Sequence, residues 1–473
     1  MPDSPLAQAC ALAARYLDSL PDRHVGGRAD RQALRAALGG PLPDRGADPA
    51  AVLDALARDA DAGLVATAGP RYYGFVTGGA LPVTVAADWL ASAWDQNGAM
   101  EVMSPAVAVL EDIVAGWIID LVGLPRGASV GFVTGAHMAN FTCLAAARHG
   151  VLRRAGWNVE EDGLQRAPRL TVIAGDHVHV SVVGALRMLG VGAAELVKVA
   201  VDDQGRMRLD ALDEALSQRA SGPLIVCAQA GNVASGATDP LAGIARAAHE
   251  RGAWVHIDGA FGLWAAVVPE LQDQVDGLAE ADSWTTDAHK WLNVPYDSGL
   301  AIVAHPAPHR AAMSLHASYL ERGDGERAGM DWTPESSRRA RVVPLYALLR
   351  TLGRDGVVDL VRRTCALAGR MAEALAREPG ISILNRVVLN QVLVRFTAGG
   401  GDAADDALTR EVIRRVQADG TCWAGGASWF GRQVMRISVC NWSTTGDDID
   451  RSAEAIAACY AAARSGRSSS SLR

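Results

Sequence analysis

A lysine set among aromatic and apolar residues is the first feature of this sequence that could do chemistry. Lys290 lies between His289 and Trp291 in the run DSWTTDAHKWLNVPYDSG, in a loop that leads to the predicted strand GLAIVA. Such surroundings strip water from the ammonium group, which predicts a lowered pKa and an amine free for Schiff-base chemistry. On this segment alone, the alternative is a surface lysine beside a chance histidine.

A carboxylate precedes this lysine by 32 residues. Asp258 ends the apolar run WVHID, and open α/β sheets bind ligands beyond the carboxyl ends of their strands. An acidic side chain there could keep the ring nitrogen of a cofactor protonated, so that the ring accepts electrons. The alternative is a buried aspartate that caps the following turn.

The run GFVTGAHMAN predicts a strand, a tight turn and the start of a helix. Thr134 and Gly135 end the strand, so backbone N–H groups and the helix dipole converge on one point that suits a phosphate. The run lacks the GxGxxG pattern, and an ordinary tight turn is the alternative.

Two histidines follow the predicted strand LTVIAG, in the run GDHVHVSVVGALRMLG. His179 opens an amphipathic helix at the same edge of the sheet, where its ring could stack on a flat cofactor and transfer protons. His177 points elsewhere and is interpreted as structural. A structural role is also the alternative for His179.

Short apolar runs alternate with helical ones through the middle of the chain. This alternation predicts βαβ units and an α/β fold with a mostly parallel sheet covered on both faces. We expect an N-terminal helical segment at 1–83, a large domain at 84–345 and a small α+β domain at 346–465. The composition of the last residues, 466–473, predicts a disordered tail.

The composition excludes several classes of protein. The net charge is −8 and no basic run is present, which argues against a nucleic-acid partner. No apolar stretch reaches the roughly 18–20 residues of a membrane helix, and the N-terminus lacks the basic start of a secretory signal. Seven isolated cysteines, without a CxxC pair, predict buried thiols of a reducing cytoplasm and no metal site.

Together these runs resemble the group II pyridoxal-phosphate-dependent decarboxylases, the family of glutamate, aromatic amino acid and diaminobutyrate decarboxylases. The resemblance extends from about residue 70 to about residue 450, and it is carried by PRYYGF, SPAVAVLE, GFVTGAHMANFTCLAAAR, HVHVSVVGALRMLG, GNVASGATDPL, HIDGAFG, TTDAHKWLNVPYDSG and MRISVCNWSTT. It implies a fold-type-I enzyme with pyridoxal 5′-phosphate (PLP) as cofactor and a small-molecule amino acid as substrate. It also implies a homodimer with the active site at the subunit interface.

The resemblance further implies a role for each matching residue. Lys290 is then the Schiff-base lysine, Asp258 the partner of the pyridine nitrogen, and His179 the histidine stacked on the ring. The other implied cofactor contacts are Ala260 against the ring, Gly135, Ala136 and His137 in the phosphate turn, His289 beside the phosphate, and Asn232 near the ring.

One departure from the family pattern bears on the reaction. Many relatives carry a loop tyrosine that protonates the carbanion after CO₂ leaves, whereas the corresponding run ERGDGERAGMD (321–331) contains none. Either another acid such as His179 replaces it, or the reaction diverts. We therefore expect an L-amino-acid α-decarboxylase that releases an amine and CO₂. The alternatives are an oxidative deaminase or aldehyde synthase, an aminotransferase, a C–C lyase, and a non-catalytic scaffold, against which the retained lysine, aspartate and histidine argue.

Overall fold

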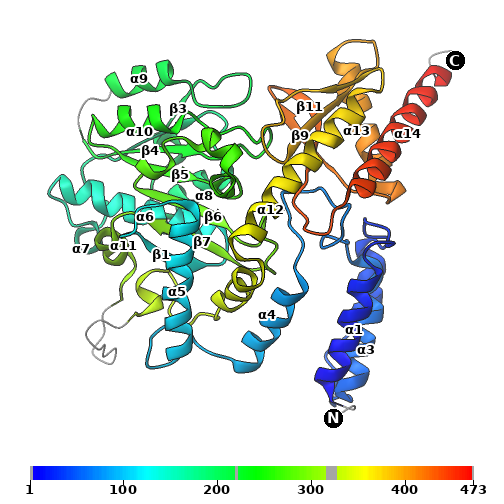
Figure 1. Cartoon of the computed structure of the whole chain (residues 1–473), viewed down its shortest axis with the longest axis horizontal. Helices are drawn as coiled ribbons and strands as arrows, with labels where there is room; N and C mark the ends of the chain where they lie inside the picture. Colours follow the sequence, from blue (N-terminus) through cyan, green and yellow to red (C-terminus); the bar gives the residue numbers. More distant parts are fainter. Residues whose placement is uncertain (1–3, 219–221, 316–326, 471–473) are drawn as a thin grey trace. The chain divides into compact units, whose positions relative to one another are not determined.

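The computed structural model describes residues 4–218, 222–315 and 327–470, and the chain divides into two compact units (Figure 1). The larger unit comprises residues 80–369 and 385–392, and the smaller one comprises 1–79, 370–384 and 393–473. The N-terminal residues up to Gly79 therefore belong to the same unit as the C-terminal region. Helix α12 (Val342–Ala376) begins in the larger unit and ends in the smaller one, and its backbone leaves helical geometry at Gly353, where φ is 59°.

A seven-stranded sheet with the order β1-β7-β6-β5-β4-β2-β3 forms the centre of the larger unit. Its strands are β1 (Ser129–Val133), β2 (Thr171–Gly175), β3 (Leu196–Val199), β4 (Leu224–Gln229), β5 (Trp254–Asp258), β6 (Ser283–Asp287) and β7 (Gly299–Val303). Strands β3, β2, β4, β5 and β6 run parallel, whereas β7 is antiparallel to both β6 and β1. The predicted α/β class with a mostly parallel sheet is confirmed.

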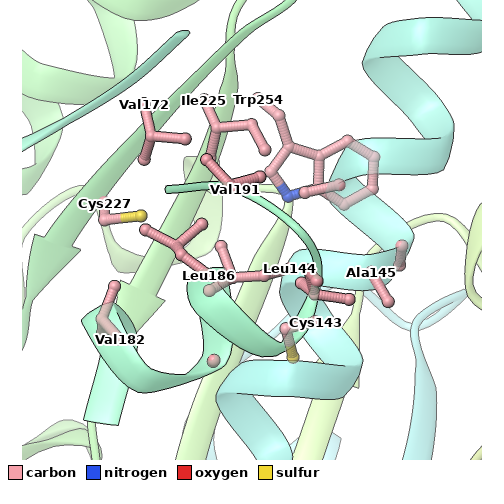
Figure 2. Packing of buried hydrophobic residues seen from close by; sticks show 14 of the residues in the cluster. Cys143, Leu144, Ala145, Val172, Val182, Leu186, Val191, Ile225, Cys227 and Trp254 are labelled. Atoms are coloured by element: carbon pink, nitrogen blue, oxygen red, sulfur yellow. The ribbon is translucent and has the colours of Figure 1, made fainter. Parts of the chain in front are cut away.

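Helices cover this sheet, and five of its strands (β1, β4, β5, β6 and β7) are buried at every residue, as in sheets covered on both faces. The helices of this unit are α4 (Pro82–Trp94), α5 (Pro105–Val122), α6 (Ala136–Arg154), α7 (Val159–Asp162), α8 (Val180–Met188), α9 (Leu209–Ser217), α10 (Leu241–His249) and α11 (Pro306–Met313). Cys143 and Leu144 of α6 pack with Leu186 of α8 and with Ile225 and Trp254 of the sheet (Figure 2). This packing sets the start of α6 and of α8 relative to the strand ends.

The smaller unit holds a four-stranded sheet with the order β10-β11-β9-β8. Its strands are β8 (Ile381–Ile383), β9 (Gln391–Phe396), β10 (Gly425–Trp429) and β11 (Arg432–Ser438). Its helices are α1 (Pro5–Ser19), α2 (Arg31–Leu38), α3 (Pro49–Ala60), α13 (Asp402–Asp419) and α14 (Gly446–Ser470). Phe430 and Gly431 join β10 to β11 with φ of 46° and 79°, the positive pair that a tight hairpin turn requires.

The structure differs from the sequence-based expectation at three places. β6 was not predicted as a strand; it carries serine and threonine, and its ladders with β5 and β7 stabilise it as a buried strand. The glycine-containing β10 was also not predicted, and it pairs with β11 as a hairpin. The tail predicted as disordered at 466–473 is helical as far as Ser470, because α14 continues without a proline and each added residue adds a backbone hydrogen bond.

Within the described ranges, no helix combines the length and the apolar character needed to cross a membrane. The same residues contain no group of three or more His, Cys, Asp or Glu side chains arranged to hold a metal ion. The seven cysteines are all free thiols.

Candidate active site

The carboxyl ends of β4, β5 and β6 border a cavity of about 280 Å³ in the larger unit. Because these strands are parallel neighbours, their last residues, Gln229, Asp258 and Asp287, lie at one edge of the sheet. The turn before α6 and the start of α8 complete the wall. The lining residues are Gly135, Ala136, His137, His179, Ser181, Gln229, Gly231, Val233, Asp258, Ala260, Phe261, Asp287, His289 and Lys290.

Lys290 follows β6 by three residues and carries the amine of this cavity. Its Nζ lies 2.9 Å from Oδ2 of Asp287, a carboxylate that is only 1% exposed. Burial lowers the pKa of Lys290, but the negative charges of Asp287 and Asp258 outweigh burial and leave that pKa raised. The predicted lowering of the lysine pKa is therefore wrong, because the apolar run around Lys290 conceals a buried counter-ion.

Asp287 connects the lysine to the turn before α6. Its Oδ1 accepts a 2.6 Å hydrogen bond from the backbone N–H of Ala136, and its Oδ2 lies 3.5 Å from Nε2 of His289. Burial lowers the pKa of His289, which favours the neutral ring. Nδ1 of His289 accepts the backbone N–H of Ser298 at 3.2 Å, which leaves the ring proton on Nε2, facing Asp287.

The turn before α6 directs backbone N–H groups to the same cavity. Gly135 caps the helix, and the first intrahelical hydrogen bond runs from the N–H of Ala139 to the carbonyl of Gly135 at 2.9 Å. The N–H groups of the three residues before Ala139 therefore lie outside the intrahelical hydrogen bonds. Gly299 in β7 lets the turn approach the sheet, because a Cβ there would lie 2.4 Å from Cα of Gly135. The positive end of this 19-residue helix suits an anion such as a phosphate.

Asp258 and His179 carry the remaining polar groups of the cavity. The Asp258 carboxylate accepts from the backbone N–H of Ala260 at 3.1 Å and from Nδ2 of Asn140 at 3.2 Å. His179 caps α8, and its Nδ1 lies 3.2 Å from the backbone N and 2.7 Å from Oγ of Ser181. The cavity therefore holds a fixed carboxylate and an aromatic base as well as an amine and an anion site.

The structure brings all but one of the sequence-predicted site residues to the cavity wall: Gly135, Ala136, His137, His179, Asp258, Ala260, His289 and Lys290 line it. Asn232 is buried outside that lining, and its Oδ1 accepts the N–H groups of Ala234 at 2.9 Å and Ser235 at 3.3 Å. It holds the turn after β4, while its neighbours Gly231 and Val233 reach the cavity. Of the loop 321–331, residues 321–326 lie outside the described residues.

Four polar residues of this site were not predicted from the sequence, and one of them is Gln229, which ends β4 at the cavity. Asp287 ends a strand, as Asp258 does, but it was missed because β6 carries hydroxyl side chains and was not recognised as a strand. Ser181 follows His179 by two residues at a helix start, where a hydroxyl commonly bonds a neighbouring group. Asn140 lies within α6, and its sequence surroundings carry no signal that it reaches Asp258.

This set of groups fits a planar, phosphorylated aldehyde with a protonatable ring nitrogen. The helix N-terminus suits the phosphate, the amine of Lys290 suits the aldehyde, and the carboxylate of Asp258 suits a protonated ring nitrogen. A parallel-sheet fold with these groups at its strand ends defines a pyridoxal-phosphate enzyme.

Comparison with known proteins identifies the family. A family model described as the pyridoxal-dependent decarboxylase conserved domain matches residues 35–397. An aromatic-L-amino-acid decarboxylase of Bacillus atrophaeus is 25% identical over 93% of this chain and 92% of its own. A phenylacetaldehyde synthase of Arabidopsis thaliana is 26% identical over 84% of each chain. The structure of Oryza sativa TDC with PLP and tryptamine superposes with a TM-score of 0.90 at 23% identity, over 97% of each chain.

The chain belongs to the pyridoxal-dependent decarboxylase family. The resemblance inferred from the motifs is confirmed, as is the PLP cofactor. The protein is a PLP-dependent amino acid decarboxylase, and the non-catalytic scaffold is set aside.

Proposed function

We propose that this enzyme removes the α-carboxylate of an L-amino acid in the cavity around Lys290 and returns a proton to Cα from His179, releasing an amine. In atoms, the substrate loses CO₂ and gains one proton at Cα, with no change of oxidation state at the nitrogen. The observation that carries the proposal is the convergence of Lys290, Asp258 and His179 on one cavity.

Lys290 and Asp287 form the end of the site that would hold the cofactor covalently. The Asp287 carboxylate, 2.9 Å from Nζ, keeps the partly buried lysine charged until the amine is needed. The N–H groups at the start of α6 would bind the phosphate, and His137 and His289 flank that turn. These contacts support a fixed orientation of the cofactor relative to the lysine.

Asp258 is the proposed partner of the cofactor's ring nitrogen. When bound, PLP supplies an electron sink that stabilises the carbanion left by loss of CO₂. Asp258 would hold the proton on the ring nitrogen, and its own geometry is set by the donors from Ala260 and Asn140. Ala260 would lie against the ring, as its place in the cavity lining supports.

His179 is the proposed acid because it is an imidazole in the cavity wall, held at Nδ1 by Ser181. Imidazole is the side chain most suited to proton transfer near neutral pH. The described residues that line the cavity include no tyrosine, and the run 321–331 contains none. An imidazole acid would therefore keep the reaction on the amine-forming course.

Formation of an aldehyde is the second candidate, favoured by that missing loop tyrosine and by the resemblance to the phenylacetaldehyde synthase. In that reaction the amino acid, dioxygen and water give aldehyde, CO₂, ammonia and hydrogen peroxide. The carbon–nitrogen bond is oxidised and dioxygen is reduced.

Product analysis separates the two reactions. The holoenzyme is assayed with each common L-amino acid, and CO₂, amine, aldehyde, ammonia and dioxygen uptake are measured together. We expect CO₂ and amine in equal amounts without dioxygen uptake. Aldehyde in equal amount to CO₂, with matching dioxygen uptake, would replace the first candidate by the second.

We also propose a homodimer in the cytoplasm. Exposed apolar side chains on α4 and α5, among them Trp89, Trp94, Val109 and Ile113, support burial against a second copy. The free cysteines support a reducing compartment. Sedimentation of the holoenzyme tests the dimer, and a fully active monomer would refute it.

A further inference from the structure

A chain of buried hydrogen bonds runs behind the cavity, and Asn140 lies at its branch point. Asn140 is 0% exposed, in the second turn of α6. Its Nδ2 lies 3.2 Å from Oδ2 of Asp258 and 3.1 Å from Oγ of Ser181, and its Oδ1 lies 2.8 Å from Nε2 of His256. One amide therefore contacts the ring-nitrogen partner directly and also contacts Ser181, which holds the proposed acid.

The donors and acceptors of this chain can be assigned in only one consistent way. Oδ1 of Asn140 can only accept, so Nε2 of His256 carries a proton and donates it. Burial lowers the pKa of His256 to about 4, so its Nδ1 is unprotonated and accepts the hydroxyl of Ser283 at 2.9 Å. That hydroxyl oxygen in turn accepts the indole N–H of Trp254 at 2.9 Å.

With Oδ1 of Asn140 fixed on His256, both amide protons point the other way. One is donated to the Asp258 carboxylate and one to the hydroxyl oxygen of Ser181. The reversed amide would place its oxygen against the carboxylate, two acceptors at 3.2 Å, which is unfavourable in a buried site. The Asp258 carboxylate thus sets the direction of the Asn140 amide, and His256 donates to the oxygen on its other side.

Nδ1 of His179 accepts the backbone N–H of Ser181 at 3.2 Å. The Ser181 hydroxyl, whose oxygen accepts from Asn140, therefore donates its own proton to the same nitrogen at 2.7 Å. A nitrogen that accepts two hydrogen bonds carries no proton, so the proton of neutral His179 lies on Nε2.

We propose that Asn140 is a positioning residue that fixes two groups of the site at once: it orients the Asp258 carboxylate directly, and through Ser181 it holds His179 with its proton on Nε2. The consequence for catalysis, that His179 exchanges a proton through Nε2 rather than Nδ1, rests on the proposed function of His179. The hydrogen-bond arrangement itself does not depend on the reaction.

The chain provides variants that separate the two arms. Asn140→Leu removes both arms at similar volume, and Ser181→Ala removes only the arm to His179. Thr142→Val is the matched control, because Thr142 is buried in the same helix and its hydroxyl bonds only the carbonyl of Met138, at 2.9 Å. Asn140→Ser replaces Asn140→Leu if that variant does not accumulate as folded protein.

Two readouts are taken on the full chain without substrate. The first is the Nδ1 resonance of His179 in histidine-¹⁵N-labelled holoenzyme, assigned by its loss in His179→Gln. The second is the dissociation constant for PLP, measured by thermal shift and by the visible absorbance of the bound cofactor. A supporting hydrogen bond to a charged group is typically worth about tenfold or more in such a constant.

We expect Asn140→Leu to move the His179 resonance and to weaken PLP binding by at least about tenfold. Ser181→Ala should move the resonance and leave PLP binding within about twofold, and Thr142→Val should change neither readout. An unmoved His179 resonance in both Asn140→Leu and Ser181→Ala, or unaltered PLP binding in Asn140→Leu, would overturn the proposal. If these shifts occur but no amine is formed, the proposed function fails and the positioning role stands.

Discussion

Two buried carboxylates, Asp258 and Asp287, end neighbouring parallel strands of the same sheet and line the same cavity, yet their surroundings are opposite in kind. Asp258 is held by neutral donors, the amide of Asn140 and the backbone N–H of Ala260. Asp287 faces the ammonium of Lys290 and also accepts the N–H of Ala136.

This difference shows how one strand-end position serves two tasks. A carboxylate held only by neutral donors keeps a negative charge available for a cationic ring nitrogen. A carboxylate paired with a lysine instead compensates that lysine's charge in a buried place, and so raises its pKa. The partners, rather than the position on the strand, determine which task each carboxylate performs.

Lys290→Ala should have the largest effect, because it removes the amine that would hold the cofactor. Turnover should be lost, and borohydride treatment should leave no stable cofactor adduct. Lys198→Arg is the control, since Lys198 is the chain's other lysine, half exposed on β3 and paired with Asp176 at 3.2 Å. Measurable turnover in Lys290→Ala would contradict the assignment.

Asp258→Asn should reduce kcat by about a hundredfold to a thousandfold while the fold is retained. The amide is close in shape but cannot stabilise a protonated ring nitrogen. Steady-state kinetics and the circular dichroism spectrum provide the measurement. A kcat near that of the wild type would mean that Asp258 only stabilises the turn after β5.

Asp287→Asn should have a smaller effect on kcat, because Asn still offers an oxygen to Ala136, but it should reverse the pKa shift of Lys290. In the wild type the raised pKa means that the ion pair stabilises the cofactor-free fold below the ordinary lysine pKa and is lost as pH rises through the raised value. In the variant, burial of Lys290 is no longer offset by the carboxylate charge, so the pKa of Lys290 should fall below its ordinary value. The contribution of the neutral lysine to folding stability is then lost as pH falls through that lowered pKa.

The measurement for Asp287→Asn is the pH titration of ¹³C-lysine-labelled, cofactor-free protein, which has only two lysine side chains to observe. The signal of Lys290 should titrate at lower pH in the variant, while that of Lys198 serves as the internal control. An unchanged Lys290 titration would mean that Asp287 is not its counter-ion.

Asn232→Ala should have the smallest effect, because the Asn232 side chain holds a turn and does not line the cavity. We expect a loss of about 1 kcal/mol in the free energy of unfolding and a kcat close to the wild-type value. Denaturant unfolding and steady-state kinetics measure the two quantities. A large drop in kcat at unchanged stability would restore its predicted place near the ring.

The site residues that could be predicted from the sequence are those with a local signal. Asp258 ends an apolar strand, Gly135 opens a helix, and Lys290 lies in an aromatic run, so each shows its position within a few residues. Asp287 was missed because its strand carries hydroxyl side chains, and its stability comes from ladders with strands distant in the sequence. The raised pKa of Lys290 could not be predicted for the same reason, because Asp287 is its counter-ion.

Contacts between distant segments explain what else escaped prediction. Asn140 and Asp258 are 118 residues apart, and only the packing of α6 on the sheet brings them to 3.2 Å. The α/β fold itself was predictable, because alternating apolar strands and helices leave few ways to build a covered parallel sheet. The helical extension of α14 to Ser470 was not predictable, because a serine-rich composition is typical of disorder.

The attachment of the cofactor to Lys290 is tested most directly by borohydride reduction of the holoenzyme followed by peptide mapping. Reduction fixes the cofactor to the amine that holds it, and the chain offers only Lys290, Lys198 and the α-amino group. We expect the cofactor on the peptide that contains Lys290 and on no other. Recovery of the label on Lys198 or the N-terminus, or an active enzyme that yields no reduced adduct, would contradict it.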